Sequence, residues 1–271
     1  MSADDYERPI GPWPRKVRPQ GAIRLMTSEE LRASILYEDE HLLVVNKAGD
    51  FVCHPSKDGP WSSLVGAARE YLGGGLVHLI FRLDRETSGV VVIAKDERTS
   101  RGLHTATQER RYAKIYYAIL TGELATDTVV DQPLGKDLRG PVMVKNCVVP
   151  EGQGQKAVTR YTPLAVGGGF TLARVTTETG RMHQIRAHAQ WLGHWLVGDK
   201  VYGPDQQLFL DFLEYGWTPA LEEKLFFPRQ ALHCAEIDLT LSGHEHVFRA
   251  PLHDDMRDFI RTRIGEIPAG L

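Results

Sequence analysis

The order of hydrophobic and polar positions along the chain predicts more strands than helices. Residues 34–47 alternate loosely between apolar and polar side chains and predict two strands that meet at a turn near residues 38–40. Further strands are predicted at 77–83, 90–94, 112–120, 142–149, 157–166, 170–176 and 231–241, with a bend at 87–89. Helices are predicted from Ser62 or Ser63 to Leu72, from Asp96 to about Gln108, at 182–192 and at 253–264.

These elements favour an α+β fold, because the strands often follow one another without a regular alternation of strand and helix. We expect a mixed, mostly antiparallel sheet flanked by helices and loops. Residues 1–30 are rich in proline and carry no apolar periodicity, so we predict an irregular N-terminal arm there and one domain over residues 31–271. The sequence contains no internal repeat and no clear linker.

The composition is that of an ordinary globular protein. Of the 271 residues, 42% are hydrophobic and 25% are charged. The longest apolar run, residues 89–94, is far shorter than the ~20 residues of a membrane helix, and the polar start lacks a signal-peptide core. Three cysteines without a CxxC pair support neither a disulfide framework nor a zinc ribbon. We therefore expect a cytoplasmic protein that crosses no membrane.

The net charge of −3 argues at first against a partner as acidic as nucleic acid, but it averages unequal regions. Residues 78–118 contain eight Lys and Arg against five Asp and Glu, and residues 139–200 contain eight against three. Residues 205–271 contain six against twelve. The middle of the chain is therefore basic and the C-terminal part acidic, although uneven charge is also common on faces that meet only solvent.

A dense polar cluster stands between two predicted strands at residues 81–89. Asp84 lies there between Arg82 and Arg85. Such a cluster belongs at a strand end or in a bend, where side chains point into a cleft or into solvent. The alternative is a plain hairpin connection in which Asp84 accepts hydrogen bonds from turn amides.

Two further segments carry candidate chemistry. On the helix predicted at 182–192, Arg186 lies nearest to the apolar edge, where a partly desolvated guanidinium requires a carboxylate, and Asp84 is a candidate. The alternative is a surface arginine beside a hydrogen-bonded histidine. The strand at 112–120 places Lys114 and Tyr116 on one face, as base stacking and phosphate contact require, although tyrosines in a sheet core are also common.

Metal and nucleotide chemistry find no support. The spacing of His183, His188 and His194 does not bring three imidazoles together on a helix. No phosphate loop, dinucleotide fingerprint or GxSxG elbow is present in the sequence. We therefore expect a protein that needs no metal and no cofactor.

In their order along the chain, these segments resemble the RluA-type pseudouridine synthases. That family is marked by HRLD(x)xTSG, by a KxYxA strand, and by RxHQIRxH followed by GHPxxGDxxYG. The matching segments are 82–89, 114–118, 181–188 and 193–203, and two weaker elements match at 44–55 and 229–233. The resemblance spans about residues 35–259. Phe81 replaces a usual His, and Ala48 and Trp195 each replace a usual Pro.

The resemblance implies the pseudouridine synthase catalytic fold, with an active-site cleft across the sheet. It implies isomerisation of uridine in ribosomal or transfer RNA: the N1–C1′ bond is cut, the uracil turns, and C5 is joined to C1′. The uridine must leave its stack for this chemistry. No cofactor is required, and we expect RNA as the partner of a monomeric enzyme.

The resemblance also assigns roles to residues. Asp84 would be the catalytic carboxylate, acting as a nucleophile or as a base, and Arg186 would keep it ionised and oriented. Tyr116 would stack on the uracil and assist proton removal from C5. The predicted RNA-binding residues are Arg82, Lys114, Arg181 and His183, and Lys200 would add to the charge that binds the RNA backbone.

Two alternatives stay open. One is a catalytically idle RNA-binding protein on the same scaffold, against which the presence of Asp84, Tyr116 and Arg186 argues. The other is a base-flipping glycosylase or nuclease, against which the lack of a second catalytic carboxylate or a metal set argues.

Overall fold

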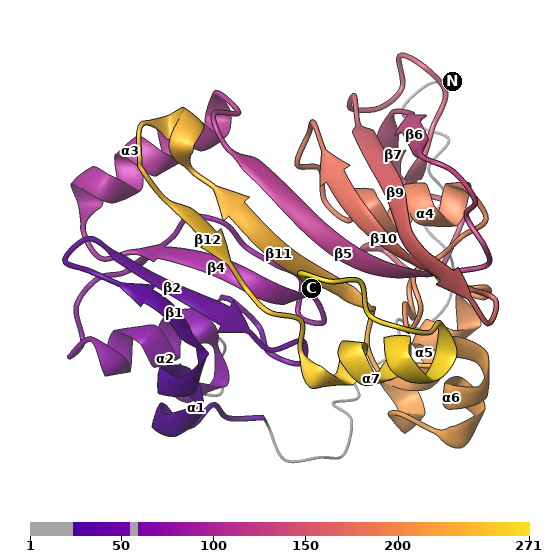
Figure 1. Cartoon of the computed structure of the whole chain (residues 1–271), viewed down its shortest axis with the longest axis horizontal. Coiled ribbons are helices and arrows are strands. Elements are labelled where there is room, and N and C mark those ends of the chain that lie inside the picture. The colour runs from indigo at the N-terminus through magenta and orange to yellow at the C-terminus, as the bar shows by residue number, and fades with distance from the viewer. Residues whose placement is uncertain (1–23, 55–58) are drawn as a thin grey trace.

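The computed structural model describes residues 24–54 and 59–271, and one long sheet runs through them (Figure 1). Its main strands follow in the order β1 (Ile35–Glu38), β2 (Leu42–Lys47), β4 (Ser88–Ala94), β11 (Leu232–Asp238), β5 (Ala113–Thr121), β10 (Phe170–Thr177), β9 (Val158–Gly167) and β6 (Thr128–Asp131). At its margins β3 (His78–Leu79) pairs with β4, and β12 (Val247–Arg249) pairs with β11. A separate hairpin consists of β7 (Leu134–Lys136) and β8 (Asn146–Val148).

The two halves of the sheet meet at the pairing of β4 with β11. This pairing is parallel and short, whereas the other strand pairs of the described residues are antiparallel. Gly89 lies in it with φ +112°, and a Cβ atom there would collide with the backbone of Cys234. Only glycine therefore allows β4 to come this close to β11. The predicted α+β class with a mixed, mostly antiparallel sheet is confirmed.

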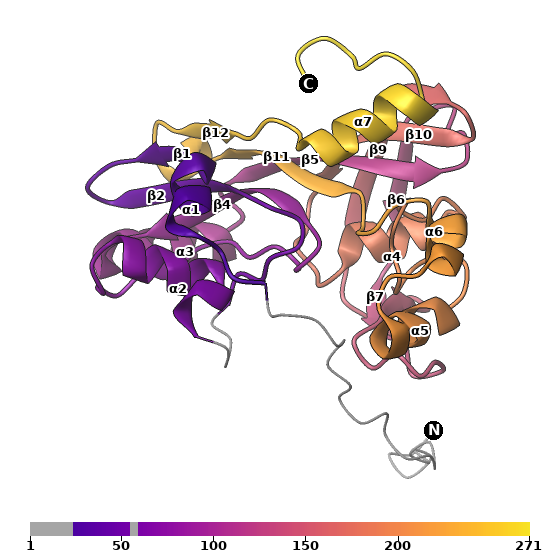
Figure 2. The same ribbon diagram turned by 90° about the horizontal axis from the view of Figure 1, so that it is seen from below.

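Helices cover both faces of the sheet unequally. Helix α7 (Asp254–Arg263) lies on one face, and the other helices lie on the opposite face in two groups, one under each half (Figure 2). The first group is α1 (Ser28–Ser34), α2 (Leu64–Tyr71) and α3 (Glu97–Gln108), and the second is α4 (Gln184–Trp191), α5 (Gln207–Tyr215) and α6 (Pro219–Leu225). Two short 3₁₀ turns are η1 (Pro60–Ser62) and η2 (Thr240–Ser242). The predicted N-caps of α2 and α3 are confirmed, because Ser63 and Asp96 accept hydrogen bonds from backbone amides of the first turn.

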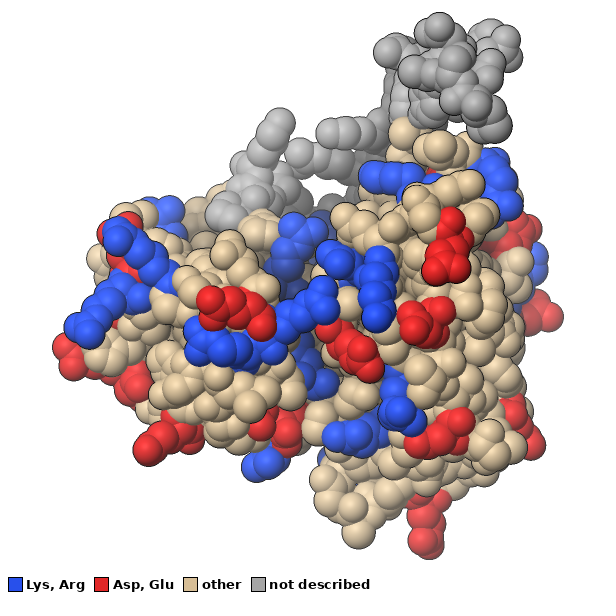
Figure 3. All heavy atoms as spheres, turned by 90° about the horizontal axis from the view of Figure 1, so that it is seen from above, with Lys and Arg blue, Asp and Glu red and all other residues tan. Residues whose placement is uncertain are grey.

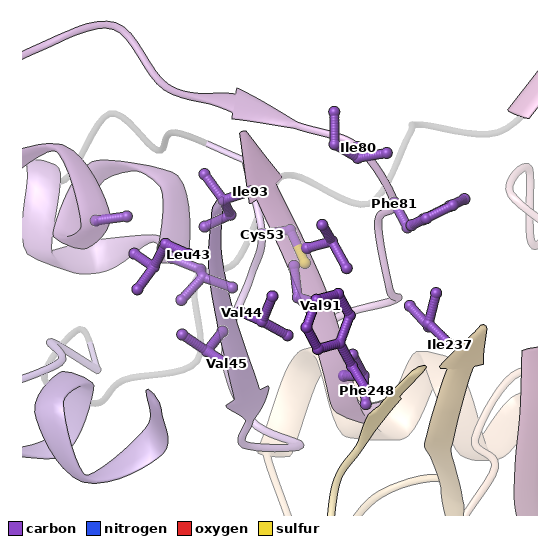
Figure 4. Packing of buried hydrophobic residues seen from close by; sticks show 14 of the residues in the cluster. Leu43, Val44, Val45, Cys53, Ile80, Phe81, Val91, Ile93, Ile237 and Phe248 are labelled. Carbon is purple, nitrogen blue, oxygen red and sulfur yellow. The ribbon is translucent and has the colours of Figure 1, made fainter. Parts of the chain in front are cut away.

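The core of the first half fixes the segment that follows β3. Val44, Val91 and Ile93 belong to the same buried cluster as Ile80 and Phe81 of that segment, and Figure 4 shows part of this cluster. Leu83 is buried in the same core, whereas Arg82 is exposed and Asp84 is half-buried. The apolar side chains therefore anchor the segment in the core, and the side chains of Arg82 and Asp84 face away from it, toward a cleft.

Several predicted boundaries are wrong. The strand predicted at 77–83 is limited to β3, because residues 80–87 leave the sheet. The turn lies at residues 85–86 rather than 87–89, and the strand predicted at 142–149 is limited to β8. The helix predicted at 182–192 begins at Gln184, since His183 has a left-handed backbone that a helix does not accept. No prediction covers α1, α5, α6, β6, β7 or β12.

The predicted N-terminal arm falls largely on residues 1–23, which lie outside the described residues. Its predicted end at residue 30 lies inside α1. Thr27 caps this helix, and Glu30 completes a capping box with it. Residues 28–30 are therefore helical rather than irregular.

Candidate active site

A cavity of about 370 Å³ opens between the two halves of the sheet. Its walls come from the segment 82–87, from the central strand β5 and from the start of α4. Figure 3 shows Lys and Arg side chains gathered where the surface is hollowed between the halves. The catalytic and RNA-binding residues that the resemblance assigns, Lys200 aside, line this one cavity: Arg82, Asp84, Lys114, Tyr116, Arg181, His183 and Arg186.

Buried cations hold the backbone around Asp84. The ammonium group of Lys47 donates to the carbonyl oxygen of Arg85 (3.0 Å) and to two other carbonyl oxygens. The ammonium group of Lys200 donates to Glu86 Oε1 (2.7 Å). Both lysines are almost completely buried. Because a buried ammonium group must keep its hydrogen-bond acceptors, these bonds fix the course of the segment that carries Asp84. Lys200 is therefore held inside the protein and is not presented to an RNA backbone, contrary to the prediction for it.

Arg186 bridges two carboxylates. Its Nη1 donates to Asp84 Oδ2 (2.8 Å), while Nε and Nη2 donate to the two oxygens of Asp199 (2.6 and 2.9 Å). Asp199 is completely buried and also accepts the backbone N–H groups of Val201 and Tyr202. The bidentate pair with Asp199 therefore orients the guanidinium before it meets Asp84. The predicted pairing of Asp84 with Arg186 is confirmed, and Asp199 was not predicted as its second partner.

This cluster keeps Asp84 ionised. Burial alone raises the pKa of the Asp84 carboxyl, but the charge of Arg186 leads the effects that outweigh it, and the pKa lies below its usual value. The pKa of Asp199 is lowered against burial for the same reason. Asp84 is therefore a carboxylate at neutral pH, as a nucleophile or a general base must be.

Gln230 adds a second contact from the other side of the segment. Its Nε2 donates to Thr87 Oγ1 (2.5 Å) and lies 3.5 Å from Asp84 Oδ2. Its backbone N–H donates to Glu86 Oε2 (3.1 Å). Among the described residues, the hydrogen bonds to the Asp84 carboxylate all reach Oδ2. This arrangement leaves Oδ1 for a ligand in the cavity.

Strand β5 supplies an aromatic and a basic side chain. Lys114 and Tyr116 line the cavity, while Tyr117 packs on the opposite face of the sheet. The Lys114 ammonium lies 3.9 Å from the ring centroid of Phe81 and 5.2 Å from that of Tyr112, as in cation–π contacts. Burial lowers the pKa of Lys114 to about 8 and raises the pKa of Tyr116 well above its usual value. Tyr116 is therefore a neutral phenol that offers a ring face.

Arg181 and His183 stand just before α4. Arg181 Nε donates to the carbonyl oxygen of Lys156 (3.1 Å), and the half-buried side chain lies at the rim. His183 Nε2 lies 3.7 Å from Asp84 Oδ2. Burial, aided by the charge of Arg186, lowers the pKa of His183 to about 4. The imidazole is therefore neutral at pH 7.

Sequence reasoning gave no role to several residues on which the site depends. Each of these residues has a deeply buried polar side chain, and they are Lys47, Asp199, Tyr202 and Gln230. The one available signal was their place inside the matched motifs, since a polar residue in an apolar setting needs a partner. The sequence does not show which partner each one meets.

The described ranges, 24–54 and 59–271, offer a carboxylate site rather than a metal site. No group of three or more His, Cys, Asp or Glu side chains in them is placed to hold a metal ion. In the same ranges we find no helix with the length and apolar character needed to cross a membrane. An ionised carboxylate beside a neutral aromatic ring, in a cavity edged by cations, suits attack on a nucleoside within an RNA strand.

Comparison with known proteins gives consistent results. A family model described as RNA pseudouridylate synthase matches residues 41–191. The ribosomal large subunit pseudouridine synthase D of Zymomonas mobilis is 33% identical over 242 residues, which cover 84% of this chain and 72% of that protein. An uncharacterised RNA pseudouridine synthase of Chloroflexus aurantiacus is 37% identical over 80% of this chain and 65% of that protein.

A solved structure shares the fold. The human RNA pseudouridylate synthase domain containing 4 superposes with a TM-score of 0.70, covering 89% of this chain and 97% of that chain at 24% identity. At this level of identity the likeness concerns the fold alone.

Proposed function

Since this chain belongs to the RNA pseudouridylate synthase family, which isomerises uridine in RNA to pseudouridine, we propose that Asp84 and Arg186 carry out this reaction in the cavity between the two halves of the sheet. The observation that carries the proposal is the ion pair between Asp84 Oδ2 and Arg186 Nη1 at 2.8 Å. It joins two segments that are 102 residues apart in the sequence. Such a pair, open to a cavity on one side, is arranged for chemistry rather than for surface charge.

In this proposal a uridine leaves its stack and enters the cavity. The ring of Tyr116 stacks on the uracil, and Asp84 Oδ1 reaches the nucleoside. The N1–C1′ bond breaks, the uracil turns, and a C5–C1′ bond forms while C5 loses its proton and N1 gains one. Asp84 acts either as a nucleophile or as the base that removes a sugar proton. Because burial raises the pKa of Tyr116 and keeps its phenol protonated, this side chain is suited to stacking on the base and not to removing the C5 proton.

The cations of the rim bind the RNA backbone. Arg82, Lys114 and Arg181 edge the cavity, and a second hollow of about 710 Å³ continues past Asp84 toward α5. The two hollows share Arg82, Leu83, Asp84, His183 and Arg186. This gives room for nucleotides on both sides of the target uridine. Binding through phosphates is largely independent of sequence and weakens with salt.

We further propose that the substrate is large-subunit ribosomal RNA, because several similar proteins carry that substrate in their names. Mapping of pseudouridines in total RNA from cells without this gene would identify the RNA, and loss of a transfer RNA site instead would redirect the proposal. We also propose that residues 31–271 act as one catalytic domain, since one sheet runs through them. The monomeric state and the cytoplasmic location stay predictions.

Release of tritium from C5-labelled uridine in RNA tests the function. We expect Asp84→Asn to abolish release while RNA binding persists, because the amide is neither a nucleophile nor a base. Asp127→Asn is the matched control, since Asp127 is half-exposed and, within the described residues, its ion pair is with Arg160. Undiminished release by Asp84→Asn would refute the assignment. Free uracil in the products would indicate a glycosylase.

A further inference from the structure

A chain of polar contacts leads from the protein interior to the carboxylate of Asp84. The backbone N–H of Asn146 donates to the Tyr202 hydroxyl oxygen (2.8 Å). That hydroxyl lies 3.1 Å from His183 Nδ1. The other ring nitrogen, Nε2, lies 3.7 Å from Asp84 Oδ2. The chain thus joins the β7–β8 hairpin, the segment after α4, and the segment that carries Asp84.

The burial of Tyr202 sets the direction of its contact with His183. The Tyr202 side chain is completely buried, so its hydroxyl proton needs an acceptor. Among the described residues, His183 Nδ1 is the acceptor within hydrogen-bond distance. A ring nitrogen that accepts a hydrogen bond carries no proton, so the neutral imidazole holds its proton on Nε2. This N–H is the one beside Asp84.

The backbone of His183 is strained in a way that serves this contact. Its φ of 58° and ψ of 19° lie in the left-handed region, which costs a residue with a side chain ~1 kcal/mol or more. The strain sets the imidazole edge-on to the Tyr202 ring, with centroids 5.6 Å apart and planes at 88°. Strain of this kind persists where surrounding contacts demand a particular side-chain position.

We propose that Tyr202 fixes His183 as the Nε2–H tautomer. In this tautomer His183 is a neutral donor that, together with Arg186 and Gln230, occupies Oδ2 of Asp84. Oδ1 is then left as the reacting oxygen. The part that concerns the reacting oxygen rests on the proposed function. His183 and Tyr202 are positioning residues. At 3.7 Å the contact with Asp84 is longer than a hydrogen bond, and we expect it to shorten when substrate fills the cavity.

The opposite tautomer would work against the reaction. It would turn the Nε2 lone pair toward the carboxylate, and protonation of His183 would relieve that repulsion. A protonated His183 would then pair with Asp84 and make its oxygens poorer nucleophiles and bases. The charged groups that face His183 or its partner Tyr202 come from all the packed segments and are Arg82, Asp84, Lys145, Arg186 and Asp199.

The closing experiment reads the tautomer directly. In ¹⁵N spectra of the labelled full-length protein at pH 7, we expect His183 to show a protonated Nε2 and an unprotonated Nδ1. We expect Tyr202→Phe to lose this preference, because Nδ1 then lacks its donor. Tyr161→Phe is the matched control: it also removes a buried hydroxyl, one that donates to the Ile185 carbonyl oxygen of α4, but it leaves His183 untouched.

The pH profile of kcat/KM supplies a second measurement. In Tyr202→Phe the neutral imidazole loses a hydrogen-bond donor, so the pKa of His183 rises. We therefore expect the acidic fall of kcat/KM to begin at a proton concentration ~10-fold lower than in the wild-type protein, as the loss of one hydrogen bond of ordinary strength would give. Tyr161→Phe should keep the wild-type profile.

Two results would overturn the proposal. One is a protonated Nδ1 of His183 in the wild-type protein, and the other is a set of unchanged spectra in Tyr202→Phe. Failure of the proposed function is distinguishable, because it would show in Asp84→Asn turnover and leave these spectra unaffected.

Discussion

The two sides of the cavity are built on different principles. The inner wall presents Asp84 and Arg186, which are held at hydrogen-bond distance by each other and by the buried side chains of Asp199 and Gln230 behind them. The outer rim consists of Arg82, Lys114 and Arg181, whose described contacts are with aromatic rings and a carbonyl oxygen rather than with carboxylates. The inner wall is thus organised before substrate arrives, while the rim keeps its charge for phosphates. We therefore expect substitutions in the inner wall to lower the rate of isomerisation and substitutions in the rim to lower the affinity for RNA.

The largest effect is expected from Arg186→Met in the inner wall. It leaves Asp199 buried and uncompensated, so the free energy of unfolding should fall by about 3–5 kcal/mol, with isomerisation lost. Arg249→Met is the control. Arg249 pairs with Glu236 in a largely exposed position, and its loss should cost less than about 1 kcal/mol in urea unfolding. Equal losses in the two variants would contradict the difference between buried and exposed pairs.

The pH dependence of stability sharpens this prediction. In the wild-type protein the folded pKa values of Asp84 and Asp199 are lowered, so their contribution is present above the unfolded pKa near 4 and is lost as the pH falls through the folded values. In Arg186→Met, burial raises the pKa of Asp199 instead. We therefore expect the stability deficit of the variant to shrink between pH 7 and pH 4. A constant deficit would show that Asp199 does not depend on Arg186.

A smaller effect is expected from Gln230→Leu. The variant loses the contacts with Thr87 and Asp84 but keeps the ion pair with Arg186. Misplacement of the carboxylate should lower kcat by about 10- to 100-fold with little change in RNA affinity. Gln190→Leu is the control, because Gln190 donates to the Gly203 carbonyl oxygen away from Asp84. A drop in RNA affinity without a drop in kcat would show that Gln230 contributes to RNA binding and not to the placement of Asp84.

The pH dependence of RNA affinity tests the role of Lys114 at the rim. Its pKa is lowered to about 8 by burial, so its charge is present below pH 8 and lost above it. RNA affinity should therefore fall as the pH rises from 7 to 9, by roughly fivefold for ~1 kcal/mol of lost attraction. Lys114→Met should start from the weaker affinity and remain flat over that range. A parallel decline in the variant would assign the titration to another group.

Arg181→Gln should have the smallest effect. Arg181 is half-buried at the rim, and removal of one phosphate contact should lower RNA affinity a few-fold and reduce the salt slope by about 1. Lys224→Gln, on α6, is the control for a plain loss of surface charge. Titrations at several salt concentrations would measure both slopes, and equal slopes in variant and wild type would remove Arg181 from the interface.

The sequence predicted features that depend on local patterns and motifs better than features that depend on contacts between distant segments. The long strands β4, β5, β9 and β10 and the caps of α2 and α3 follow from local patterns. The residues that line the cavity were predicted because they stand in recognisable motifs. Charge and expected burial made Asp84 a candidate partner of Arg186, but the sequence did not show that the two side chains meet. The second carboxylate, Asp199, and the amide of Gln230 escaped prediction, because their roles depend on partners distant in the sequence. His183 was predicted as an RNA ligand, whereas its left-handed backbone and its contact with Tyr202 arise only from packing.

The most direct test of the account compares one variant from each side of the cavity in a single experiment. Single-turnover isomerisation of a cognate RNA and its dissociation constant would be measured together for Asp84→Asn and Arg181→Gln. We predict that Asp84→Asn binds RNA like the wild-type protein and forms no pseudouridine, while Arg181→Gln binds more weakly and isomerises bound RNA at the wild-type rate. Pseudouridine formed by Asp84→Asn would contradict the account.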